Sequence, residues 1–133
     1  MELKLIDFGI CRTYLEENGA HIEEGSQAGE GNVAFASVTS LQNQRISRRD
    51  DLFSLYLVLV YLRTGKIPGG TSSILRCRND FIKLRLNTDP LDYCDNDDCR
   101  FLKQFFLEIA FTQFKQEPNY GRLRYLLAEC LIQ

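Results

Sequence analysis

The longest apolar run in the chain lies near its centre and predicts a buried helix. Residues 52–62 read LFSLYLVLVYL, which leaves no polar face at helical spacing. Ser47 is the expected N-cap, because its hydroxyl can accept a hydrogen bond from the first free N–H groups, and Asp50 and Asp51 suit the positive end of a helix. Gly65 is expected to end the helix. The run is too short to span a bilayer and charged residues flank it, so it predicts a core helix.

Three further helices are predicted downstream, at about residues 74–86, at 98–113 and after the sequence KQEPNYG. Each carries apolar residues three or four positions apart, which is typical of a helix with one face on the core. The residues expected on these faces are Ile74, Phe81 and Ile82, then Phe101, Leu102, Phe105, Phe106 and Ile109, and finally Leu123, Leu126, Leu127, Cys130 and Leu131.

The first 31 residues show a different pattern. Residues 3–6 and 10–14 are short strand-like runs on either side of the turn Asp7-Phe8-Gly9, and they predict a small β-hairpin. Residues 15–31 are polar and rich in glycine, so they predict a long flexible loop, which in a compact domain is usually functional or disordered. The sequence therefore predicts a single, mainly α domain with a short N-terminal β-hairpin and about four helices.

Composition narrows the possible partners and sites. The 133 residues carry a formal net charge of −2, which gives no electrostatic footprint for nucleic acid or an anionic membrane. A basic group at Arg76, Arg78, Lys83 and Arg85 favours the solvated face of a helix over an anion site.

No Cys-x-x-Cys pair accompanies the single His21, which argues against a zinc site. Asp95, Asp97 and Cys99 faintly match a calcium loop, but a helix cap is the better interpretation. The sequence starts without a secretory leader, which favours an intracellular location, cytoplasmic or nuclear.

Four motifs occur in a consistent order along the chain. They are Asp7-Phe8-Gly9, GNVAFAS at residues 31–37, SRRDDL at residues 47–52 and EPNYGRLRYLL at residues 117–127. In this order and spacing they resemble the casein kinase I group of protein kinases, and SRRDDL is the most specific of them. The resemblance covers nearly the whole chain. It implies the C-terminal lobe of a protein kinase, with the Asp-Phe-Gly hairpin and activation segment at 1–39 and the helical lobe at 40–133.

The resemblance also implies roles for individual residues. Asp7 matches the residue that binds Mg²⁺ between the ATP phosphates, Phe8 matches a packing anchor and Gly9 a hinge. Asp51 matches the carboxylate that accepts backbone N–H groups of the catalytic loop. A structural role is implied for Ser47, Arg49 and Asp51, all within SRRDDL.

Several parts of a kinase are not found in these 133 residues. Phosphoryl transfer needs a phosphate-binding Gly-rich loop, a Lys–Glu pair and a catalytic-loop Asp, which in the family precede Asp-Phe-Gly. Only six residues precede Asp7, so we expect a partial kinase domain without the N-lobe and catalytic loop. This chain alone is expected to be inactive and to bind no Mg-ATP. Asn32 and Ala34 also replace the Thr and Arg of the family motif, which bears on substrate phosphorylation and on the recognition of primed substrates.

Three functions therefore compete. The first is a fragment of a casein-kinase-I-like serine/threonine kinase whose full-length parent phosphorylates protein substrates with Mg-ATP. The second is a non-catalytic, pseudokinase-like lobe that binds a protein partner. The third is an unrelated helical adaptor. The central helix lacks a polar face, and the resemblance implies that a long helix and the catalytic loop, both preceding Asp-Phe-Gly, cover part of it. Because these elements are not found in the 133 residues, we also expect an uncovered apolar strip, drawn from Leu55, Tyr56, Leu59 and Leu62, through which the chain could self-associate.

Overall fold

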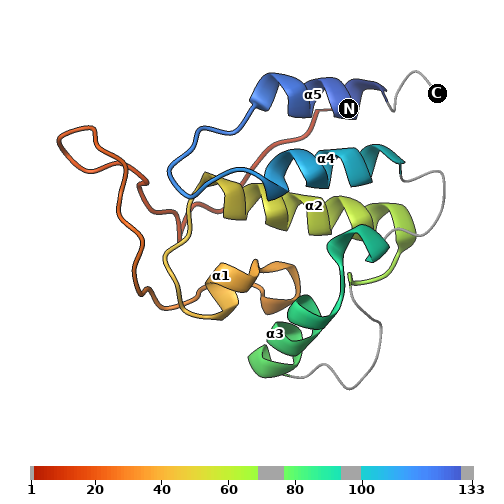
Figure 1. The fold of residues 1–133 in the computed structure, drawn as a ribbon, viewed down its shortest axis with the longest axis horizontal. Helices are drawn as coiled ribbons and strands as arrows, with labels where there is room; N and C mark the ends of the chain where they lie inside the picture. The colour runs from red at the N-terminus through yellow and green to blue at the C-terminus, as the bar shows by residue number, and fades with distance from the viewer. Residues whose placement is uncertain (1, 69–76, 94–99, 130–133) are drawn as a thin grey trace.

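The computed structural model describes residues 2–68, 77–93 and 100–129. Five α-helices lie within these ranges: α1 (Val38–Leu41), α2 (Arg48–Thr64), α3 (Arg78–Asn87), α4 (Arg100–Ala110) and α5 (Tyr120–Glu129). Two short 3₁₀ turns cover Val33–Phe35 and Pro90–Tyr93. Helix α2 runs through the middle of the molecule, with α4 and α5 on one side of it and α1 and α3 on the other (Figure 1). The mainly α prediction is confirmed.

Helix α2 begins and ends where the sequence predicts. Its N-cap is Ser47, whose backbone N–H donates to Asp50 Oδ2 at 2.9 Å. At the other end, Gly65 adopts the left-handed conformation with φ 70°, and its N–H donates to the Tyr61 carbonyl at 2.8 Å. A residue with a Cβ would be strained in that conformation, which explains the glycine.

The main core lies where α2, α4 and α5 meet. The buried side chains there are Tyr56, Leu57 and Val60 from α2, Leu102, Phe105 and Ile109 from α4, and Leu123 from α5. These confirm the predicted apolar faces of the last two helices, although Cys130 and Leu131 lie outside the described residues. The Tyr56 hydroxyl donates to the Pro90 carbonyl at 2.5 Å, which satisfies its polar atom within the core.

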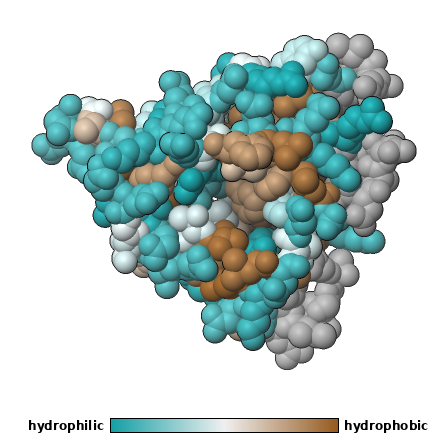
Figure 2. Space-filling view, in the orientation of Figure 1, coloured by the Kyte–Doolittle hydropathy of each residue, from teal (hydrophilic) through white to brown (hydrophobic). Residues whose placement is uncertain are grey.

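The apolar strip expected on α2 is uncovered at two of its four residues. Leu55 and Leu62 are 40% and 72% exposed, and they lie seven residues apart on one face of the helix. Tyr56, expected in the uncovered strip, is fully buried, and Leu59 is half-buried. Figure 2 shows apolar side chains gathered over the region of α2 and α4 on the face that it displays. No helix in the described ranges has the length and apolar character needed to cross a membrane.

The predicted N-terminal β-hairpin does not form. Residues 2–13 contain no strand, and the turn is closed by a single backbone bond from Cys11 N–H to the Phe8 carbonyl at 3.1 Å. A two-stranded hairpin is marginal in water unless a third element covers one face. The apolar side chains of this segment, including Leu3 and Ile6, are instead exposed to solvent.

The interpretation of the basic group at residues 76–85 as a solvated face is also wrong for two of its members. Arg85 is buried and donates to the carbonyls of Pro68, at 2.8 Å, and Ala34. Burial lowers the pKa of its guanidinium. Arg78 is half-buried, and its guanidinium donates to the Gly29 carbonyl in the loop before α1 and to the side-chain amide oxygen of Asn43 just after α1. The predicted start of this helix at residue 74, Arg76 and the calcium-loop pattern at residues 95–99 lie outside the described residues.

Candidate functional site at the start of helix α2

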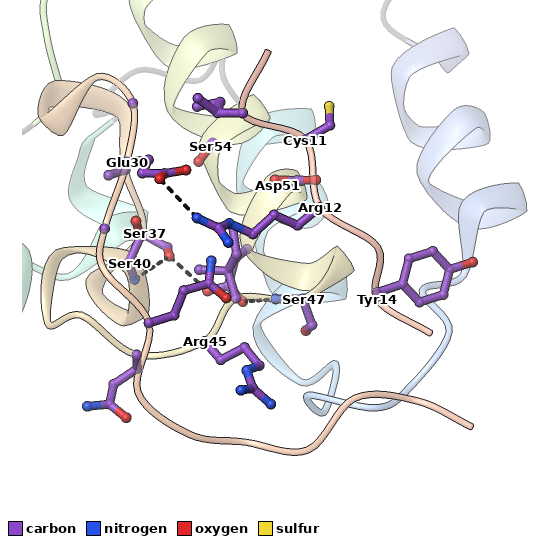
Figure 3. Close-up of a pocket in the computed structure, with 18 of the residues that line it drawn as sticks. Cys11, Arg12, Tyr14, Glu30, Ser37, Ser40, Arg45, Ser47, Asp51 and Ser54 are labelled. Carbon is purple, nitrogen blue, oxygen red and sulfur yellow. Dashed lines mark hydrogen bonds and ion pairs between the residues drawn. The ribbon is translucent and has the colours of Figure 1, made fainter. Parts of the chain in front are cut away.

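A cavity of about 450 Å³ lies in front of the first two turns of α2 (Figure 3). Its walls come mainly from residues 10–14, from residues within 27–40 and from residues within 44–54, the last of which include the start of α2. From α2 it receives Ser47, Asp51 and Ser54, which fall on one face because they are spaced by four and three residues. Polar acceptor atoms therefore line the helical wall of the cavity.

Asp50 joins two of the sequence motifs at this site. It is 5% exposed, and its Oδ1 accepts a hydrogen bond from the Ser37 hydroxyl at 2.8 Å. Its Oδ2 accepts the N–H of Ser47 at 2.9 Å. Ser37 ends the GNVAFAS motif and Ser47 opens SRRDDL, so one buried carboxylate holds the two motifs together. Both hydrogen bonds are charge-assisted because their acceptor is a carboxylate, and hydrogen bonds of this kind are stronger than those between neutral groups.

Asp51 differs from its neighbour. Its side chain is exposed at the cavity wall, and no described residue donates a hydrogen bond to it. Two effects raise the pKa of the Asp51 carboxyl. The surrounding protein partly excludes water from it, and the neighbouring Asp50 is negatively charged. The arrangement can therefore accept N–H donors, as the resemblance implies for this position.

An ion pair spans the cavity above α2. Arg12 Nη2 lies 2.9 Å from Glu30 Oε1, which ties residues 10–14 to residues 27–32 (Figure 3). Sequence reasoning did not identify this pair, because the two residues are eighteen positions apart in a segment with no periodic pattern.

The two arginines of SRRDDL pack the loop and the α4–α5 connection onto α2. Arg48 lies over the ring of Tyr14, 4.5 Å from its centroid, and Arg49 lies over Phe114 at 5.8 Å. His21 packs between these two rings, with centroid distances of 5.9 Å and 5.2 Å. Arg49 also donates to the Thr112 carbonyl at 3.4 Å. These contacts give Arg49 a packing role, and they join His21, in the loop predicted at residues 15–31, to Tyr14 and Phe114.

The Asp-Phe-Gly turn lies outside this cavity, whose lining begins at Ile10. Asp7, Phe8 and Gly9 are all exposed, and Asp7 has a positive φ of 63°. Its Oδ1 accepts the N–H of Gly9 at 3.3 Å. Asp7 and Asp51 therefore do not line one site.

The fit of Mg²⁺–ATP to these residues can be tested at Asp7. Mg²⁺ is usually held by one or two carboxylates together with substrate phosphates and water. Asp7 offers one carboxylate, and the described residues contain no cluster of three or more His, Cys, Asp and Glu side chains that could hold a metal ion. Asp7 can supply one ligand, but the described residues do not make a Mg²⁺–ATP site by themselves.

Comparison with known proteins identifies relatives of the chain. A probable casein kinase I homologue of Encephalitozoon cuniculi is 32% identical over 128 residues, which cover 92% of this chain and 40% of that protein. A casein kinase 1-like protein of Oryza sativa subsp. japonica is 32% identical over 130 residues, covering 92% and 18%. A probable serine/threonine-protein kinase of Dictyostelium discoideum is 27% identical over 127 residues, covering 95% and 25%. No protein-family model matches the chain.

These similarities relate the chain to serine/threonine protein kinases. Within that class it is similar to casein kinase I-like proteins, which confirms the resemblance seen in the sequence motifs. The chain spans less than half the length of the curated relatives that it matches.

Proposed function

We propose that the chain is the C-terminal-lobe part of a casein-kinase-I-like serine/threonine kinase. In this proposal residues 1–39 are the Asp-Phe-Gly and activation segment, and residues 40–133 are the helical lobe. The whole protein would transfer a phosphoryl group from Mg-ATP to protein substrates. The observation that carries the proposal is the buried Asp50, which joins the GNVAFAS and SRRDDL motifs through Ser37 and Ser47. A coincidental set of motifs in an unrelated helical adaptor would have no reason to meet at one carboxylate.

The proposal predicts what the whole gene product does. Its reading frame should continue upstream of Met1 into a Gly-rich loop, a Lys–Glu pair and a catalytic-loop Asp, and it should label casein with phosphate from ATP. Asp7→Ala should abolish that transfer by removing a Mg²⁺ ligand, whereas Asp92→Ala, an exposed acidic residue in the second 3₁₀ turn, should leave it unchanged. An upstream frame that lacks these groups, or a product that transfers phosphate equally well with Asp7→Ala, would contradict the proposal.

The 133-residue chain by itself is expected to transfer no phosphate. Positioning and charge stabilisation provide most of the catalysis in this reaction, and the groups that position ATP are not among these residues. Incubation with labelled ATP, Mg²⁺ and casein should leave the casein unlabelled above a blank without protein. For the same reason, millimolar Mg²⁺–ATP should not raise the melting temperature, because only a ligand that binds the folded state stabilises it. Transfer that disappears with Asp7→Ala would show this expectation to be wrong.

A second candidate function is a non-catalytic, pseudokinase-like lobe that binds a protein partner. The exposed apolar residues Leu55 and Leu62 favour it, since contiguous apolar surface often marks an interaction site. In both proposals the protein acts inside the cell, in the cytoplasm or nucleus. The free, exposed Cys11 and Cys77 support a reducing compartment.

The exposed face of α2 predicts dye binding and self-association by the 133-residue chain. Leaving a large apolar side chain in water forgoes about 1.5–3 kcal/mol, which association can recover. Leu62→Glu should therefore reduce both the fluorescence of a hydrophobic dye and the apparent mass in light scattering. Leu86→Glu is the matched control, because Leu86 is similarly exposed, at 60%, but lies on α3. Equal effects of the two variants, or a strictly monomeric wild type that binds no dye, would contradict this prediction.

A further inference from the structure

One wall of the cavity is attached to the rest of the molecule through Arg78. Residues 27–32 form this wall, and Arg78 is the first residue of α3. Its Nη2 donates to the Gly29 carbonyl at 3.0 Å, and its Nη1 donates to Asn43 Oδ1 at 2.7 Å. Asn43 Oδ1 also accepts the N–H of Gly29 at 3.0 Å. The three residues, at positions 29, 43 and 78, thus form a closed network of hydrogen bonds.

The backbone around this network is shaped to fit it. Asn43 has a positive φ of 56°, a conformation that asparagine adopts more readily than most residues. At Gly29 a Cβ would overlap the Ser40 carbonyl oxygen and the Arg78 guanidinium, so only glycine fits between them. A further bond, from Gln27 N–H to the Asn43 carbonyl at 2.9 Å, continues the attachment along the loop.

The charge of Arg78 does not suit its position in the helix. A cation in the first turn of a helix opposes the helix dipole. The first turn also carries Asp80, which suits the dipole, but the oxygens that Arg78 itself contacts are carbonyl and amide oxygens. The guanidinium therefore stabilises contacts outside α3. Its partners are Gly29, which belongs to the loop, and Ser40, Leu41 and Asn43, which belong to α1 and the turn after it.

We propose that Arg78 is a positioning residue that holds residues 27–31 against α1 and so fixes one wall of the cavity. None of the residues from 27 to 31 is fully buried, so hydrogen bonds rather than apolar packing decide whether this wall stays attached. Without Arg78 the wall loses its contact with α3 and is held more weakly against α1, while its ion pair with Arg12 remains and the core of α2, α4 and α5 stays folded. The proposal goes beyond the kinase assignment and does not depend on any catalytic activity.

Amide hydrogen exchange on the full 133-residue chain tests this proposal. Arg78→Ala should speed exchange of residues 27–31 by roughly tenfold, because hydrogen bonds to a charged group are lost there. Amides in the middle of α2, such as those of Leu57 and Val60, should keep their wild-type rates. Lys83→Ala is the matched control, since Lys83 is an exposed basic residue on the same helix and its removal should change neither region.

A second pair of variants tests the network without altering α3. Asn43→Gly keeps the positive φ but removes Oδ1, so it should release residues 27–31 as Arg78→Ala does. Asn43→Asp keeps an oxygen that can accept both bonds, so it should preserve the wild-type protection. This pair also decides the question if Arg78→Ala does not fold. The proposal is overturned by unchanged exchange in Asn43→Gly, by equal release in Asn43→Asp, or by faster exchange throughout α2.

Discussion

Phe105→Ala is expected to remove much of the stability of the fold. Phe105 is fully buried on α4 and belongs to the cluster that joins α2, α4 and α5. Truncating a buried phenylalanine costs about 3–5 kcal/mol, because the apolar contacts are lost and a cavity remains. The whole stability of a domain is about 5–15 kcal/mol, so this single change removes a large part of it. Far-UV circular dichroism during urea denaturation should show the midpoint fall steeply.

Phe111→Ala provides the matched control for this variant. Phe111 follows the end of α4 and is 81% exposed, so its truncation removes little packing. Surface substitutions of this kind usually change stability by less than about 0.5 kcal/mol. Similar losses in the two variants would mean that Phe105 does not lie in the core described above.

The helices could be predicted because their signals are local. Apolar residues three and four positions apart place Leu102, Phe105 and Ile109 on one face whatever the rest of the chain does. Both ends of α2 likewise follow from neighbouring residues, because the Ser47 N–H donates to Asp50 three positions on and the Gly65 N–H donates to the Tyr61 carbonyl.

The errors concern interactions between distant residues. Arg85 reaches the carbonyls of Pro68 and Ala34, which are 17 and 51 positions away, and nothing near Arg85 in the sequence indicates either contact. Arg78 similarly contacts Gly29 at a separation of 49. A local pattern assigns both arginines to solvent because basic residues are mostly exposed. The hairpin at residues 3–14 fails for the opposite reason: its local pattern is adequate, but no described element covers it.

The candidate site was predicted in part. The sequence located the start of α2 and both of its acidic residues, but it could not decide which carboxylate is buried. That depends on Ser37, which meets Asp50 across a separation of 13 residues. The cavity could not be predicted either, because its walls come together only in three dimensions.

Asp50→Ala is expected to destabilise the chain by about 2–4 kcal/mol, since it removes a helix cap and leaves two buried polar groups without their partner. These groups are the Ser37 hydroxyl and the Ser47 N–H. Asp50→Asn should cost less, because its amide oxygen can still accept one of the two bonds. Chemical denaturation of both variants at pH 7 measures the difference, and equal losses would mean that the acceptor oxygen kept in Asp50→Asn does not stabilise the fold.

Asp51→Asn is the matched substitution at the next position, and its effect should have the opposite sign. The folded protein raises the pKa of Asp51 above its ordinary value of 3.8, so folding favours the protonated carboxyl. The stability gained from that proton is fully present below the ordinary pKa and is lost as the pH rises through the higher folded pKa. At pH 7 the charged Asp51 therefore opposes folding, and a neutral asparagine should leave stability unchanged or slightly raised. The variant should also flatten the dependence of the denaturation midpoint on pH above 3.8. A loss of stability at pH 7 comparable to that of Asp50→Ala would instead mean that Asp51 accepts hydrogen bonds that hold the fold together.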